Sequence, residues 1–148
     1  MKFAATLNLG ANGLLAKLRT EPLGRLAEII VLDQFPRHVY RDRGEAYAFD
    51  RRAQSCCLMA LNDETHISFS AIENTFLLMP LIHCEEIELQ RLGGELLRSY
   101  GTQSARESAM RHMKVIKKFG RFPHRNISLN RKSTEAEEIF LSGPVSRF

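Results

Sequence analysis

The sequence predicts an all-α protein made of antiparallel helix pairs. In nearly every segment, apolar residues recur at the three- and four-residue spacing of amphipathic helices. No pair of alternating apolar runs is joined by an Asn-Gly or Asp-Gly turn, which would have indicated a β-hairpin. With 148 residues, 44% of them hydrophobic, the chain has the size of one domain with its own core. We therefore treat residues 1–148 as a single all-α domain.

The first predicted helix is central to the fold. Apolar residues cover most sides of residues 23–35, so little of this helix can face water. The residue before a proline is disfavoured in the α conformation, so Phe35, before Pro36, is predicted to end the helix. Phe122, before Pro123, is predicted to mark a second helix end in the same way.

Further helices follow the central one. Pro80 either occupies the first turn of a new helix or kinks one long helix. The last helix is marked by a capping box, in which Thr134 and Glu137 would exchange hydrogen bonds at its N-terminus. The predicted spans are about 45–61, 68–79, 80–100 and 104–119, with the final helix after residue 134.

Composition narrows the class of protein. No apolar run approaches the roughly 18 residues that would span a bilayer, and the first residues do not resemble a secretion signal, so we expect a soluble, cytoplasmic protein. The three cysteines match neither a disulfide framework nor a zinc ribbon. No Gly-rich phosphate loop, nucleophile elbow or spaced Cys/His pair is found, so we predict no cofactor and no metal.

Basic charge is concentrated at the C-terminal end. Residues 1–100 carry 11 Lys/Arg against 13 Asp/Glu, whereas residues 101–148 carry 10 against 4. One helix presents a basic ridge, which we expect to be a solvated face because no aromatic residues are interleaved with it. Nucleic-acid binding is therefore not expected. The ridge consists of Arg111, Lys114, Lys118 and Arg121.

Two Phe-Pro dipeptides are surrounded by polar residues, in DQFPRH (33–38) and in GRFPHRN (120–126). We expect these two segments to be the walls of one polar site. Asp33 lies on the mostly apolar central helix, so its carboxylate is expected to be buried and to need a cationic partner. The candidate partners are Arg37, Arg121 and Arg125.

A histidine continues the apolar face of another predicted helix. His83 follows Phe76 and Met79 on that face, so it should point inward. It is either a core histidine satisfied by a hydrogen bond or a functional group. No second histidine lies three or four residues away, so the spacing does not indicate a metal ligand.

Three stretches resemble a bacterial family known as domain of unknown function 924. They are GRLAEIIVLDQFPRHVYR (24–41), LLMPLIHCEE (77–86) and FGRFPHRNISLNRKSTEAEEIFL (119–141). The resemblance implies a tetratricopeptide-like arrangement of helices and no particular activity. The family pattern has asparagine where this chain has His38, and serine where it has Cys84. Family members usually begin with a further aromatic-rich helix that this chain lacks. We therefore expect a site that is open on one side, or a shortened chain completed by another subunit.

These observations converge on one candidate site. Three arginines with two histidines favour a small anion bearing phosphate or carboxylate, held by guanidinium forks. If the site is catalytic, His83 or His124 would act as acid or base, with Asp33 orienting it. Predicted ligand contacts are Gln34, Arg37, Glu85, Arg121, Arg125 and Asn126.

The alternative is a structural polar network inside a helical scaffold whose concave face binds a peptide. Burial separates the two hypotheses, because a ligand site must open into a pocket that reaches the arginine tips. Arg121, still on a helix, is expected to hold Asp33. Arg125 and His124, beyond the helix end, are expected to project from a loop onto the ligand.

Overall fold

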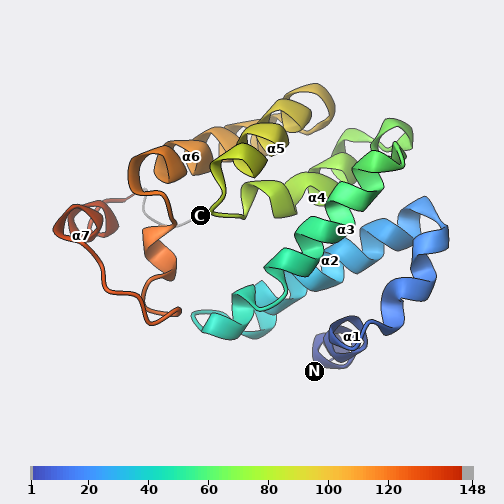
Figure 1. Cartoon of the computed structure of the whole chain (residues 1–148), viewed down its shortest axis with the longest axis horizontal. Helices are drawn as coiled ribbons and strands as arrows, with labels where there is room; N and C mark the ends of the chain where they lie inside the picture. Colours follow the sequence, from blue (N-terminus) through green and yellow to red (C-terminus); the bar gives the residue numbers. More distant parts are fainter. Residues whose placement is uncertain (1, 145–148) are drawn as a thin grey trace.

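A computed structural model describes residues 2–144, and these residues form helices and no strand, as predicted. Figure 1 shows the helices stacked side by side from the N-terminal α1 to α5 and α6, with α7 in a separate C-terminal segment. Along residues 2–144, no helix combines the length and apolar content that crossing a bilayer requires. The α-helices are α1 (Lys2–Ala11), α2 (Pro22–Val39), α3 (Asp50–Asn62), α4 (Ala71–Ile82), α5 (Ile87–Tyr100), α6 (Gln103–Phe119) and α7 (Glu135–Leu141). Short 3₁₀ helices are η1 (Leu14–Thr20), η2 (Gly44–Tyr47), η3 (Thr65–Ser68) and η4 (Pro123–Arg125).

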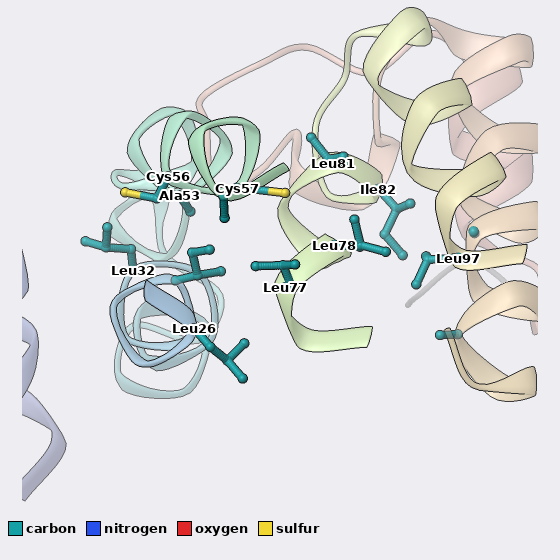
Figure 2. Close-up of a cluster of buried hydrophobic side chains, with 14 residues drawn as sticks. Leu26, Leu32, Ala53, Cys56, Cys57, Leu77, Leu78, Leu81, Ile82 and Leu97 are labelled. Atoms are coloured by element: carbon teal, nitrogen blue, oxygen red, sulfur yellow. The ribbon is translucent and has the colours of Figure 1, made fainter. Parts of the chain in front are cut away.

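The central position predicted for the first apolar helix is confirmed. α2 packs against α1, α3 and α4, and α5 packs between α4 and α6. In Figure 2 leucines of α2 and α4 face the small residues of α3, among them Cys56 and Cys57. Short loops between packed neighbours make the consecutive helices antiparallel, so the core is continuous from α2 to α6.

The prediction that Phe35 ends this helix is wrong. α2 continues through Pro36 to Val39, and the main-chain N–H of Tyr40 donates to the carbonyl of Pro36 (2.8 Å). Proline removes a single main-chain donor so near the helix end, and burial of the helix outweighs that loss. This extra turn carries Arg37 and His38 toward the candidate site.

Two other boundaries differ from the prediction. The span predicted from Glu45 divides into η2 and α3, which begins only at Asp50. Pro80 does not begin a helix, because it lies inside α4, and the chain breaks later, over residues 83–86. That break places His83 at the C-cap of α4, where its side chain is partly exposed. α1 was not predicted, because polar and apolar residues alternate there.

The C-terminal segment turns back toward α2 and α3 (Figure 1). α6 ends at Gly120, whose φ of 68° is the left-handed value that glycine adopts readily. The predicted capping box of Thr134 and Glu137 is confirmed at the start of α7. Where the segment meets the α2–α3 connection, a Cβ on Gly44 would lie 2.8 Å from the carbonyl oxygen of Ser128. Glycine is therefore what permits the two chain segments to approach so closely.

Candidate functional site

A cavity of about 590 Å³ opens where the end of α2, η2, the α4–α5 turn, α6 and η4 meet. This volume is within the range of small-molecule sites. Side chains from both Phe-Pro segments line it, so the two segments are walls of one cavity. The polar lining residues are Gln34, Arg37, His38, Arg41, Asp42, Tyr47, His83, His112, His124, Arg125 and Ser128.

A carboxylate–imidazole pair lies in the cavity wall. Nδ1 of His83 is 2.9 Å and 3.0 Å from the two carboxylate oxygens of Asp33. Asp33 also accepts a hydrogen bond from the Gln34 amide and lies 3.3 Å from Nη1 of Arg37. Since an ionised carboxylate can only accept, Nδ1 of His83 carries a hydrogen and its proton chemistry falls on Nε2.

Asp33 is ionised although it is only 1% exposed. Burial by itself would raise the pKa of this carboxyl, but the charges of His83 and Arg37 and the hydrogen bonds to it outweigh burial and lower the pKa to about 2. The carboxylate is therefore charged at neutral pH and fixes the orientation of His83.

A second aspartate bridges two arginines. Arg37 donates to Asp50 (Nη2 to Oδ2, 3.0 Å), and Nη1 of Arg125 lies 3.5 Å from the same oxygen. Asp50 is in the first turn of α3, where the helix dipole favours a carboxylate. Arg37 also donates to the main-chain oxygen of Asp33 (2.5 Å). Both guanidiniums are thus fixed in place before any ligand arrives.

Arg125 is held on three sides. Its guanidinium carbon lies 4.5 Å from the ring centroids of both Tyr47 and Phe122, and Nη2 donates to the main-chain oxygen of His83 (2.8 Å). Burial and the nearby charge of Arg37 lower the pKa of Arg125. A cation kept in such a dehydrated position is attracted to any anion that enters the cavity.

His112 is the buried imidazole of the site. Nδ1 lies 3.0 Å from the carbonyl oxygen of Ile82 and must donate to it, because a carbonyl only accepts. Burial, and next the charge of His83, lower the pKa of His112 to about 3. The ring is 5.9 Å from His83 between centroids. One imidazole is thus kept neutral while its neighbour is bound to a carboxylate.

The cavity rim is more exposed. His38, Arg41 and Asp42 are exposed, while His124 and Ser128 are half-buried. Asp42 has a φ of 62°, a left-handed conformation that aspartate tolerates better than most residues. The rim mixes both charges, with arginine and aspartate as neighbours in sequence.

Comparison with other proteins identifies the family. The model of a family described as bacterial protein of unknown function (DUF924) matches residues 1–145. The chain belongs to this family. The solved structure of a protein of unknown function from Agrobacterium tumefaciens resembles it with a TM-score of 0.89 and 29% sequence identity, covering 95% of this chain and 79% of that one. No curated protein matches the chain significantly.

The cavity of this DUF924 protein brings together most of the predicted site residues and excludes three. Gln34, Arg37, His83, His124 and Arg125 line it, and Asp33 lies directly behind His83. The three residues outside it belong to a tether that holds the C-terminal segment. They are Glu85, Arg121 and Asn126.

The tether consists of buried or half-buried ion pairs. Arg121 donates to both carboxylate oxygens of Glu137 (2.7 and 2.8 Å), and the amide of Asn126 lies 3.3 Å from the same carboxylate. Arg131 donates to both oxygens of Glu85 (2.6 and 2.9 Å), which also accepts from the main-chain N–H of Phe122. These contacts are structural and lie away from the cavity.

Two predicted roles need correction. Arg121 does not hold Asp33, because Glu137, sixteen residues along the chain, takes its guanidinium. Arg125 does not project freely from a loop, since it is only 6% exposed and packed between two rings. It still lines the cavity, which is the part of the prediction that the geometry supports.

Sequence analysis missed several members of the site. Tyr47, Asp50 and His112 come from segments that carry no Phe-Pro dipeptide. For His112 a signal was available, because it lies one turn before Ile116 on the inward face of α6. For Asp50 there was none, since its partner Arg125 is 75 residues away.

The cysteines do not take part in the site. Burial raises the pKa of the Cys57 and Cys84 thiols, which keeps them protonated and poorly nucleophilic. Among residues 2–144, no group of three or more histidine, cysteine or acidic side chains is arranged to hold a metal ion.

Proposed function

We propose that the cavity binds a small molecule bearing a phosphate or carboxylate group. The observation that carries this proposal is the exposure of arginine side chains to one enclosed volume. Arg37, Arg41 and Arg125 line a cavity of about 590 Å³. A purely structural network would be closed to solvent, as the contacts of Glu85 and Glu137 are.

The inner arginines support the proposal further through their fixed geometry. Arg37 and Arg125 are held by Asp50, and Arg125 is also stacked between two rings. An anion that meets them needs little reorganisation of the protein, and preorganisation of this kind favours affinity. The guanidinium fork suits the planar carboxylate and the phosphate oxygens equally well.

Thermal unfolding with added anions tests this proposal. We expect sulfate, phosphate and citrate to raise the melting temperature by mass action, relative to chloride at the same ionic strength. Arg41→Gln should reduce that rise, because Arg41 lines the cavity. Arg43→Gln is the matched control, since Arg43 is exposed on the same turn, pairs with Glu45 and is not in the lining.

Two outcomes would contradict the proposal. If none of the three anions raises the melting temperature of the parent protein, the cavity is not an anion site. If both arginine variants respond like the parent, the anions bind elsewhere, for example on the basic ridge of α6. Either result would favour the alternative, a helical scaffold that binds a peptide.

A further inference from the structure

The fixed charges around the cavity cancel. Three arginines line it, and three aspartates oppose them: Asp42 in the rim, and Asp33 and Asp50 directly against Arg37 and Arg125. Within the described chain, the cavity is therefore electrically balanced when its histidines are neutral. An anion entering a balanced site gains much less than one entering a site with net positive charge.

The histidines are the groups that can change this balance near neutral pH. His83 differs from the others because a carboxylate lies against its Nδ1, 2.9 Å away. An imidazolium at this position would be stabilised on one side by Asp33 and on the other by an anion at Nε2. His112 cannot play this part, because burial lowers its pKa to about 3.

We propose that the anion binds together with a proton, and that His83 carries this proton. The inference rests on the proposed function and adds the ionic form of the site: an imidazolium at His83, clamped between Asp33 and the ligand. The fitting ligand presents an unprotonated oxygen to Nε2, as sulfate, phosphate and carboxylates do. The proton comes from solvent when the ligand binds and returns to it on release.

The other charged and titratable groups near His83 do not offset this gain. Arg125 donates to the main-chain oxygen of His83, away from Nε2, and Arg37 is bound by two aspartates. Glu85 points its carboxylate at Arg131 and the main chain of Phe122. The groups around the pair are Asp33, Arg37, Asp50, Glu85, His112 and Arg125.

The test measures the dissociation constant of sulfate by calorimetry between pH 6 and pH 8. Sulfate does not change its charge in this range, and cationic buffers such as Bis-Tris and Tris do not compete with it. We expect affinity to fall as pH rises, approaching about tenfold per pH unit at the upper end, because one proton must be taken up. His83→Gln should bind more weakly and show less than about twofold change over the range.

Two further variants locate the proton. His38→Gln and His124→Gln also alter the cavity lining and should weaken sulfate binding, but the fall of affinity with pH should persist in both. If His83→Gln does not fold, the side-chain nitrogen resonances of His83 in the parent protein answer the same question. Adding sulfate at pH 7.5 should convert them to the imidazolium pattern.

The outcomes separate this inference from the proposed function. Sulfate binding with equal affinity at pH 6 and pH 8 would overturn the proton requirement and leave anion binding intact. A pH dependence that survives in His83→Gln and disappears in His38→Gln or His124→Gln would assign the proton to another histidine. Absence of sulfate binding at every pH would overturn the proposed function itself.

Discussion

At the scale of single residues, the site depends on one buried carboxylate. Asp33 orients His83, anchors Arg37 and accepts from Gln34, although burial alone would favour its neutral form. A pKa about two units below the ordinary value corresponds to about 2 kcal/mol of stability at neutral pH. The polar residues of the first Phe-Pro segment therefore serve the fold and the cavity together.

Asp33→Asn should lower the free energy of unfolding at pH 7 by about 3 kcal/mol, because Arg37 and His83 lose their buried counter-charge. The folded pKa is depressed, so the contribution is complete above the unfolded pKa of about 4 and is lost as pH falls toward 2. Urea unfolding at pH 7 and at steps below pH 5 should show parent and variant converging. Asp63→Asn is the control, since Asp63 pairs with Arg25 at the surface and should cost less than about 1 kcal/mol. A gap between parent and Asp33→Asn that stays constant down to pH 2 would contradict the role given to this carboxylate.

At the scale of elements, two connections decide the shape of the cavity. The α2–α3 connection supplies Asp42 and Tyr47, and the C-terminal segment supplies His124 and Arg125. They meet where Gly44 approaches Ser128. The cavity therefore depends on a contact between two irregular segments more than on helix packing.

Gly44→Ala should separate these segments, because its Cβ would lie 2.8 Å from a main-chain oxygen that cannot move aside cheaply. We expect a loss of about 1–3 kcal/mol in unfolding free energy and weaker sulfate binding. Gly94→Ala is the matched control, since a Cβ there meets nothing within 4 Å on α5, and it should stabilise by about 0.5–1 kcal/mol. Equal stability of the two variants would show that the close approach does not constrain the cavity.

Helical periodicity was enough to predict the all-α class, the central α2 and the capping box of α7, because each depends on residues a few positions apart. It failed at Pro36 and Pro80, where packing keeps a proline within a helix against its local preference. Asp33 was predicted to be buried and paired from its own helix, and it is. The partners of Arg121 and Arg125 could not be predicted, because Glu137 and Asp50 reach them only through the tertiary fold.

At the scale of the whole molecule, the C-terminal segment is attached to the helical stack mainly through polar contacts. Glu85 binds Arg131 and the main chain of Phe122, whereas Phe119, Phe122 and Phe140 belong to a separate small apolar cluster with Val115 and Ile116. The cavity exists only while this segment stays attached, since His124 and Arg125 belong to it.

Glu85→Gln should loosen this attachment, because Arg131 loses its bidentate carboxylate. Hydrogen exchange should become faster over residues 120–141, while the amides of α2 to α5 keep their protection. Glu88→Gln, which alters a fully solvated pair with Arg91 on α5, should change neither region. Uniformly faster exchange across the chain in Glu85→Gln would indicate that the segment and the stack unfold as one unit.

The separation of Arg125 from Asp50 by 75 residues also bears on the order of events in folding. Contacts between neighbouring helices close short loops and form early, whereas a pairing across half of the chain must wait for its ends to meet. During synthesis, η4 leaves the ribosome after α2 to α6 are complete, so the stack can form while the cavity still lacks a wall. A refolding chain should thus regain its helical signal before it regains the capacity to bind sulfate.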